Sequence, residues 1–357
     1  MTHFADEQIG TSPSAPVLPR ARRRRGRRTL LLLAGSILLV VGVAAVVPAP
    51  TIWGPPTTVE AHNGGGLQAL SCAKPSYCAT FDFYGHFFIS RDGMWHEAKF
   101  RVSRRLEAPT DVSCPVEGFC MVSDDDGDVW RVAGDSVTRT DVTGPNDDLV
   151  AVSCTSKTFC VAVSDNGDGY TYDGAVWSKG YEFSGQPDEM QAVSCVSSHF
   201  CVASDGNGNV YVYDGASWSA TSLRVPRDDS VSELSCASAV FCVGVLLFSG
   251  DWVEYDGSHW TLKGSFEGAQ NDGYDPTMLS CPLAGRCVAA STNDVLSQLT
   301  HGHWQKLGYL FRQSFLSREI ETLQPDPAIA VSCSSASYCV AVDGDGRAYV
   351  GNQQLSR

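Results

Sequence analysis

The stretch LVAVSCTSKTFCVAVSDNGDGYTYDGAVW, residues 149–177, carries the pattern that decides the fold of this 357-residue chain. Its apolar runs are short and are separated by clusters of Asp, Asn and Gly, which is typical of antiparallel β-strands rather than helices. We predict four strands, at residues 149–154, from Cys160 onward, at residues 170–172 and at Trp177. A five-residue turn is expected between the first two strands, and Asn166-Gly167 supplies the positive φ that the next hairpin turn requires.

The same pattern recurs along the chain, and its repeats can be counted by cysteine. All fourteen cysteines fall into C-x5-C pairs, whose first members are 40 to 52 residues apart. A serine precedes the first cysteine of every pair. Four antiparallel strands at a period near 41 residues are typical of a β-propeller blade. We therefore predict an all-β fold, a seven-bladed β-propeller that covers residues 51–357.

The two ends of the repeat region are complementary. Trp53 precedes Cys72 by 19 residues, as Trp177 precedes the first cysteine of the next repeat by 18. The seventh repeat lacks such a tryptophan. We therefore predict that the strand at Trp53 completes the last blade, which would close the ring and remove the exposed sheet edges. The alternative, an open β-solenoid, would not need complementary ends.

The cysteine spacing favours disulfide bonds over a metal site. Zinc sites use closely spaced pairs such as C-x2-C, usually grouped as four ligands, and redox catalysis would need one distinctive pair rather than seven equivalent ones. Two cysteines that flank a hairpin turn lie within disulfide reach, and such bonds persist in oxidising surroundings. We predict one disulfide in each blade: Cys72–Cys78, Cys114–Cys120, Cys154–Cys160, Cys195–Cys201, Cys236–Cys242, Cys281–Cys287 and Cys333–Cys339.

The first 50 residues carry an export signal. Seven arginines between Arg20 and Arg28 precede an apolar run that is long enough to span a bilayer as a helix. The positive-inside rule predicts a cytoplasmic Arg-rich tail at residues 1–28, a single transmembrane signal anchor at residues 29–48 and a propeller outside the cell membrane. The alternatives are secretion after signal cleavage near Val43-Ala44-Ala45, and a twin-arginine signal.

The charge of the chain is unevenly distributed. The formal net charge is −14, but the first 50 residues carry seven Arg against Asp6 and Glu7, a balance of +5, which leaves −19 for the remainder. Phosphate binding requires a basic surface, so the acidic propeller argues against nucleic acid as a partner. The simplest consequence of its charge is solubility.

The repeat unit [LV]-S-C-x4-[FY]-C-V-A-V-x3-G…Y-D-G-x2-W resembles repeats in poorly characterised exported proteins of actinobacteria. The resemblance covers residues 51–357. It implies a secreted or membrane-tethered propeller without a defined activity, and it assigns no catalytic residues.

The predicted topology separates two faces of the propeller. The turns between second and third strands share one face with the links between blades, and the turns between the paired cysteines lie on the opposite face. The link before the seventh blade, residues 308–327, exceeds the repeat period, and long loops are often functional. Its aromatic and basic side chains suit ligand binding, and the candidates are Tyr309, Phe311, Arg312, Phe315 and Arg318. The alternative is an insertion that packs on its own blade.

Acidic residues recur in the predicted turns. They could surround the mouth of the channel and hold a hard cation through oxygen ligands: Asp124, Asp125, Asp126, Asp165, Asp205, Asp251, Asp343 and Asp345. The alternative, which we favour, is that Asp, Asn and Gly are simply good turn residues. Ser123-x-Asp125-x-Gly127-x-x-Trp130 also matches the Asp-box of sialidase-like propellers, which is itself a structural turn. His301-Gly-His303 could also bind a metal, but it stands where other blades carry a surface Asp-Gly turn.

No sequence motif identifies a reaction. The eight histidines are scattered, and neither H-E-x-x-H nor G-x-S-x-G occurs. We expect no catalytic residue, no metal and no cofactor. We predict a binding, sensing or scaffolding module whose partners are the membrane, through residues 29–48, and an unknown extracellular protein or glycan. The alternative is a propeller enzyme, a glycoside hydrolase or lyase that acts on extracellular polysaccharide through carboxylates that one sequence cannot single out.

Overall fold

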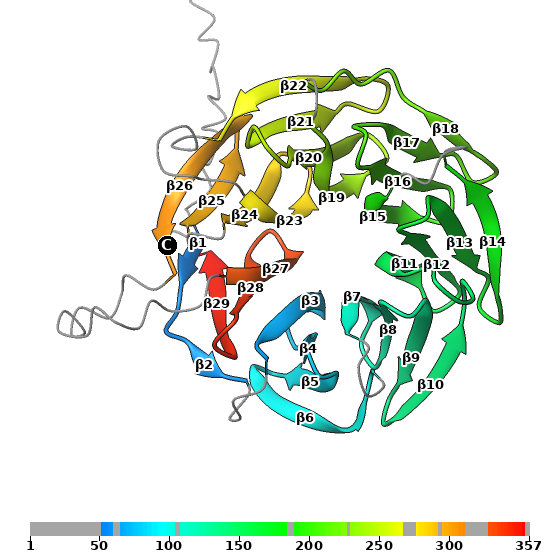
Figure 1. Ribbon diagram of the computed structural model, residues 1–357. Helices are drawn as coiled ribbons and strands as arrows, with labels where there is room; N and C mark the ends of the chain where they lie inside the picture. The colour runs from blue at the N-terminus through cyan, green and yellow to red at the C-terminus, as the bar shows by residue number, and fades with distance from the viewer. Residues whose placement is uncertain are drawn as a thin grey trace, which may run out of the picture. The chain divides into compact units, whose positions relative to one another are not determined.

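The computed structural model describes residues 51–59, 65–103, 108–183, 189–226, 229–266, 276–291, 295–310 and 328–353. These residues form seven antiparallel sheets arranged around a common axis, and each sheet is one blade of a β-propeller (Figure 1). The blades follow one another around the ring in chain order. The predicted all-β, seven-bladed architecture is therefore confirmed.

Blades 1 to 6 each contain four consecutive strands, of which the first lies innermost and the fourth on the outer rim (Figure 1). Blade 1 consists of β3 (Leu67–Lys74), β4 (Tyr77–Asp82), β5 (His86–Arg91) and β6 (Met94–Arg101). Blade 2 consists of β7 (Pro109–Val116), β8 (Phe119–Asp124), β9 (Asp128–Ala133) and β10 (Ser136–Asp141). Blade 3 consists of β11 (Leu149–Ser156), β12 (Phe159–Ser164), β13 (Asp168–Tyr172) and β14 (Trp177–Glu182).

The remaining blades continue this order. Blade 4 consists of β15 (Met190–Ser197), β16 (Phe200–Asp205), β17 (Val210–Tyr213) and β18 (Trp218–Ala220). Blade 5 consists of β19 (Val231–Ser238), β20 (Phe241–Leu246), β21 (Asp251–Tyr255) and β22 (Trp260–Ser265). Blade 6 consists of β23 (Pro276–Leu283), β24 (Arg286–Ser291), β25 (Val295–Thr300) and β26 (His303–Tyr309).

Blade 7 is assembled from both ends of the repeat region. It contains β27 (Ala328–Ser335), β28 (Tyr338–Asp343) and β29 (Arg347–Gln353), and its outer positions are filled by β1 (Thr51–Trp53) and β2 (Thr57–Thr58). Both short strands pair antiparallel with β29, and Trp53 lies opposite Gly351. The Trp53 indole is only 8% exposed and packs in a cluster with Leu310, Val331 and Tyr349. The predicted closure of the ring is confirmed.

The first hairpin of blade 3 is tighter than the sequence pattern predicts. Strand β11 continues past Cys154 to Ser156 and β12 begins at Phe159, so the turn has two residues instead of five. A register shift between Cys154 and Ser156 takes up the extra residue as a bulge. The two cysteines still face each other, because Cys154 and Cys160 are register partners.

All seven predicted disulfides are present, one in each blade, and no cysteine is free. The Cα atoms of each pair are 4.0–4.1 Å apart. Each bond joins the two innermost strands of its blade. Closing so short a loop contributes about 2–3 kcal/mol by the chain-entropy model.

The serine that precedes the first cysteine of each repeat links neighbouring blades. Its hydroxyl oxygen accepts a hydrogen bond from the backbone N–H of the first cysteine in the next blade, over 2.8–3.0 Å. The seven bonds form a closed circuit, because the Cys72 amide at the start of the ring donates to Ser332 at its end. Each innermost strand is a sheet edge, whose free amides need such partners. The circuit gives the repeated serine a structural role.

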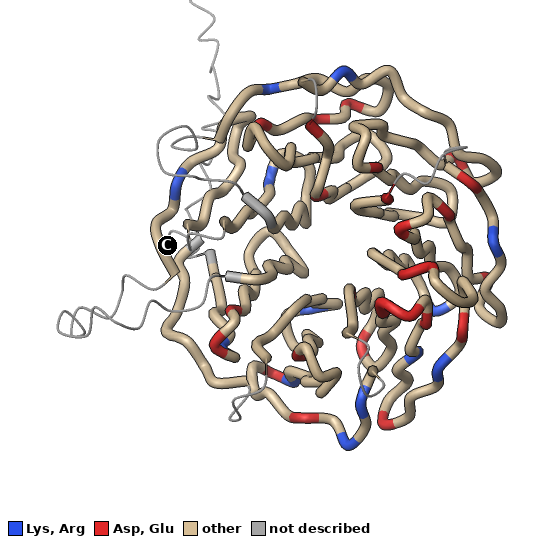
Figure 2. The backbone as a smooth tube through the Cα atoms, in the orientation of Figure 1, with Lys and Arg blue, Asp and Glu red and all other residues tan. Residues whose placement is uncertain are grey.

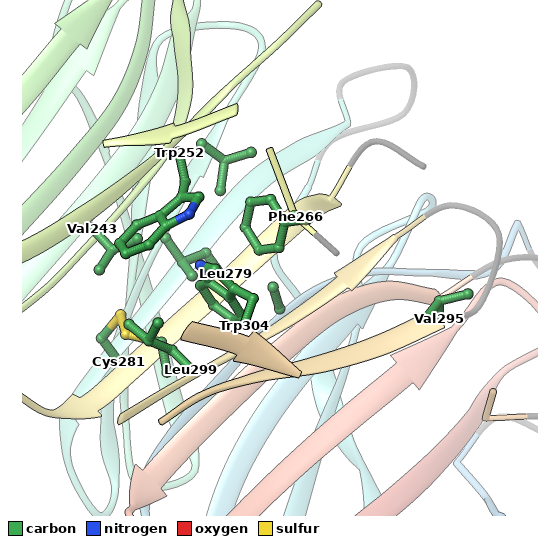
Figure 3. Packing of buried hydrophobic residues seen from close by; sticks show 11 residues of the cluster. Val243, Trp252, Phe266, Leu279, Cys281, Val295, Leu299 and Trp304 are labelled. Carbon is green, nitrogen blue, oxygen red and sulfur yellow. A yellow bond between two sulfur atoms is a disulfide. The ribbon is translucent and has the colours of Figure 1, made fainter. Parts of the chain in front are cut away.

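Apolar side chains fill the seven interfaces between neighbouring blades. Between blades 5 and 6, Trp252 and Phe266 pack against Trp304, with ring centroids 6.0 Å and 4.4 Å from the Trp304 ring (Figure 3). All three side chains are buried. Because every blade is packed on both sides, the innermost strands are held in fixed positions around the axis.

Among the described residues, no helix combines the length and apolar character needed to cross a membrane. The predicted cytoplasmic tail, residues 1–28, and the predicted signal anchor, residues 29–48, lie outside the described residues. Both stay predictions.

Candidate functional site

The strand order assigns every turn to one of two faces. The turns between second and third strands lie on the same side as the links between blades, and we call this side the link face; its described turns are at residues 83–85, 125–127, 165–167, 206–208, 247–250 and 344–346. The two-residue turns beside the disulfides lie on the opposite side, the disulfide face, and so do the turns between third and fourth strands. Each innermost strand therefore begins at the link face and ends at the disulfide face.

A cavity of about 290 Å³ lies inside the ring, and all seven innermost strands contribute to its lining. The lining residues stand two to four positions before the first cysteine of each repeat, so they belong to the strand halves that begin at the link face. Most of these residues have aliphatic side chains, although the surface that faces the cavity is mainly polar. Asp111 and Glu233 are the only ionisable groups among the described residues that line the cavity, and none of those residues is basic.

The Asp111 carboxylate is held by backbone amides. Its Oδ1 accepts the N–H of Val112 over 2.7 Å, and its Oδ2 accepts the N–H of Val152, in blade 3, over 2.9 Å. Burial raises the pKa of Asp111 to about 6, although both hydrogen bonds act to lower it. Asp111 thus joins blade 2 to blade 3, and it has a structural use whatever else it does.

The Glu233 carboxyl group has no such support. Within the described part of the chain it has no hydrogen-bond donor and no ion-pair partner, and the residue is half-buried. Enclosure by the walls, and then the negative charge of Asp111, raise the pKa of Glu233 to about 8. An unpaired acidic group in an enclosed space is costly to ionise, so Glu233 is a candidate functional group.

Exposed aromatic side chains stand in two separate turns of the link face. Phe83 and Tyr84, in the turn between β4 and β5, are 50% and 51% exposed, and Phe248, in the turn between β20 and β21, is 71% exposed. No other aromatic side chain in the described ranges is as exposed. Aromatic groups of this kind are typical of surfaces that bind a partner.

These aromatic turns adjoin the rim of the cavity. A Cβ atom on Gly65 would lie 2.8 Å from the Cβ of Phe83. The carbonyl oxygen of Gly65 also accepts a hydrogen bond of 3.1 Å from Gln68, whose side chain lines the cavity. In blade 5, the N–H of Leu247 donates to the carbonyl of Ser230, over 2.9 Å, just before the innermost strand begins. The aromatic turns of blades 1 and 5 therefore border the entrance.

Several acidic residues that were candidate cation ligands instead hold the link-face turns together. The Asp124 Oδ1 accepts two backbone N–H groups of its own turn, over 3.1 and 2.8 Å, and its Oδ2 accepts the indole N–H of Trp130 over 2.6 Å. Asp205 and Asp343 accept turn amides and a tyrosine hydroxyl in the same way. For these three residues the turn interpretation is confirmed, and the Asp-box-like segment around Trp130 is a structural turn.

The other acidic candidates also have partners nearby. Asp251 accepts a hydrogen bond of 2.6 Å from Ser265, and Asp345 pairs with Arg347. Over the described ranges, no group of three or more His, Cys, Asp or Glu side chains is arranged to hold a metal ion. The hydrogen bonds of these acids fit the turn interpretation, which we favour over a ring of cation ligands.

The rim beside blades 2 and 3 nevertheless carries a concentration of acidic groups (Figure 2). The Asp125 Oδ1 accepts the N–H of Ala108 over 2.8 Å, and the Asp165 Oδ1 accepts the N–H of Asp148 over 3.1 Å. Burial and then the charge of Asp125 raise the pKa of Asp148. This side of the entrance therefore presents a negative potential to an approaching ligand.

One of the five predicted binding residues lies in the described chain. Tyr309 ends β26 and is half-buried, and the Lys306 ammonium lies 4.4 Å from the centroid of its ring and donates to its hydroxyl oxygen over 3.0 Å. The other four lie outside the described residues: Phe311, Arg312, Phe315 and Arg318. Their role in binding stays a prediction.

Sequence reasoning missed Asp111 and Glu233. Both stand three positions before the first cysteine of their repeats, where five other repeats carry Ala or Met. The two acids were visible in the sequence as departures from the repeat pattern. Their importance could be recognised only when the fold placed this position on the wall of the cavity.

No protein-family model matches this chain, and no curated protein matches it. Solved structures do resemble it. Virginiamycin B lyase from Staphylococcus aureus has a TM-score of 0.69 at 7% identity, covering 85% of this chain and 100% of its own. YCF48 bound to D1 peptide has a TM-score of 0.63 at 10% identity, with coverage of 86% and 99%. The WD40 β-propeller domain of Doa1 has a TM-score of 0.65 at 12% identity, with coverage of 85% and 98%. At such identities the likeness defines the class of fold, a β-propeller, and nothing finer.

Proposed function

We propose that this protein is a binding module of the cell surface, and that a partner docks on the link face over the entrance of the cavity. The observation that carries the proposal is the position of the exposed aromatic side chains. They stand in two turns on the link face, and both turns border a cavity of about 290 Å³. Binding sites in proteins are usually concave and provided with a few well-placed polar groups.

The proposed cellular location rests on the sequence and on the disulfides. Residues 29–48 would anchor the protein in the membrane with residues 1–28 in the cytoplasm, and the propeller would lie outside. Seven disulfides are consistent with this location, because such bonds are rare in reducing compartments. The partner would then be an extracellular protein or a glycan. Tyr309 and the predicted residues of the following link would extend the binding surface.

Site-specific photo-crosslinking on intact cells tests this proposal. The photoreactive residue p-benzoylphenylalanine would replace Phe83 or Phe248 on the link face, or Val176 or Val240 on the disulfide face. The two valines are matched controls, since they are 59% and 64% exposed. We expect discrete adducts from the link-face positions and none from the valines. Equal labelling of both faces, or adducts from the valines alone, would refute the proposed binding face.

A polysaccharide-active enzyme, a glycoside hydrolase or lyase, is the second candidate. Two carboxyl groups share the cavity, and their pKa values of about 6 and about 8 would leave one mainly ionised and the other mainly protonated at neutral pH. Such a split suits an acid and base pair. Against it, both oxygens of Asp111 already accept backbone amides. Release of new sugar ends from an extracellular polysaccharide, lost in Glu233→Gln, would favour the enzyme over the binding module.

A further inference from the structure

We propose that the cavity receives a cationic side chain of the partner, an ammonium or guanidinium group on an aliphatic stem, and that Glu233 is its counter-ion. This inference rests on the proposed function and deepens it, because it names the chemical class of group that enters from the link face. A lysine or arginine side chain of a partner protein carries this chemistry.

The charge of the lining is the first reason. Asp111 and Glu233 both face the cavity, and no Lys, Arg or His among its described lining residues offsets them. Asp111 is stabilised by two amide donors, whereas Glu233 has none among the residues that the structure describes. An enclosed carboxylate without a donor or a counter-ion is unfavourable, and a cation brought beside it relieves that cost. The cavity therefore favours a positively charged occupant.

The size and walls of the cavity are the second reason. Its volume of about 290 Å³ far exceeds the roughly 10–15 Å³ that one water molecule needs. Ala69, Ala151, Ala192 and Ala330 line it and would contact the methylene groups of a stem. A hard divalent cation would need six or more oxygen ligands, usually with several carboxylates, and of the two described carboxylates in the lining only Glu233 is unengaged. An organic cation fits this arrangement better than a bare metal ion.

The entrance is the third reason. Asp125, Asp148 and Asp165 lie on the link face beside blades 2 and 3, at the side of the ring that also carries Asp111. Acidic groups around an opening attract cations and raise their local concentration. The aromatic side chains on blades 1 and 5 would contact the partner outside the cavity. The acidic groups inside the cavity and those around its opening thus both favour a cationic ligand.

The inference can be tested on the full-length protein in detergent micelles. The probe is Nα-acetyl-lysine methylamide, and Nα-acetyl-norleucine methylamide is its uncharged control; binding is followed by saturation-transfer NMR and titration. We expect saturable binding of the lysine probe alone, weakened about tenfold or more by Glu233→Gln, since tenfold corresponds to the loss of about 1.4 kcal/mol. Glu117→Gln, on the disulfide face, is the matched variant and should bind like the wild type. Binding should also tighten as the pH rises from 6 to 8, because Glu233 must ionise to pair with the ammonium.

Three results would overturn the inference. The norleucine probe could bind as well as the lysine probe, the Glu233→Gln variant could bind the lysine probe unchanged, or neither probe could bind. Displacement of the lysine probe by calcium chloride at low concentration would identify a metal site instead. Link-face adducts in the crosslinking experiment, together with any of these results, would leave the binding module standing and remove only its cationic ligand. Absence of those adducts would remove the proposed function itself.

Discussion

Replacing Trp53 by alanine should loosen the closure of the ring and lower the free energy of unfolding by about 3–5 kcal/mol. The indole is only 8% exposed and packs against blades 6 and 7. An aromatic side chain buries about 150–250 Å², and at about 25 cal/mol per Å² its removal from water is worth about 4–6 kcal/mol as an upper estimate. In contrast, Trp53→Phe should lose less than about 1.5 kcal/mol, because the Trp53 indole N–H has no acceptor among the described residues.

Trp218 provides a matched control for this experiment. It is also 8% exposed, but its strand, β18, is joined to β17 by a hairpin, whereas β1 is held to β29 only by non-covalent contacts. Trp218→Ala should therefore lose packing energy without freeing a sheet edge. Denaturant titration under oxidising conditions would report the loss of stability, and hydrogen exchange would report the edge. Faster exchange in β29 is expected for Trp53→Ala alone. An unchanged denaturation midpoint for Trp53→Ala, or equal exchange in β29 for both variants, would refute the role of the closing strand.

Three further outcomes are expected. Non-reducing peptide mapping should link every cysteine only to its C-x5-C partner, and free thiols or bridges between blades would contradict the pairing. Ser153→Ala removes the acceptor of the Cys195 amide and should lower the free energy of unfolding by about 1–3 kcal/mol. Its control, Ser178→Ala on the outer strand β14, should change that free energy by less than about 0.5 kcal/mol. Equal denaturation midpoints for the two variants would refute the importance of the serine circuit. Stability should fall as the pH rises from about 4.3 to about 8, because folded Glu233 retains a proton that the unfolded chain releases. The fall can reach about 1.4 kcal/mol per pH unit, and it should be smaller in the Glu233→Gln variant. If the stability of the variant and of the wild type depended on pH in the same way, Glu233 would ionise as freely as an exposed group.

The features of the fold that could be predicted are those that repeat. Seven C-x5-C pairs identify both the number of blades and the disulfides, since local pairing across one hairpin does not depend on distant parts of the chain. The missing strand of the last repeat and the surplus strand at Trp53 predict closure because each departs from the same repeat pattern in a complementary way. The tight turn after Cys154 escaped prediction, because a bulge in a strand leaves no mark in the alternation of apolar residues.

The candidate site was less accessible to sequence reasoning than the fold. The serine before each first cysteine was visible, but its acceptor role depends on a contact with the next blade, about 41 residues away. Glu233 is one acid among many, and what distinguishes it is that the ring encloses it without a donor from the described part of the chain. Asp124 and Asp205 show the reverse case, since carboxylates that looked like cation ligands are used by the turns in which they stand.

One crosslinking comparison on intact cells tests the binding face and its ligand most directly. The photoreactive residue would stand at position Phe248 or at Val240, each in the wild-type protein and in Glu233→Gln. We expect a discrete adduct from position 248 that weakens when Glu233 is neutralised, and no adduct from position 240. An adduct from position 240 with none from position 248 would contradict the assignment of the link face as the binding surface.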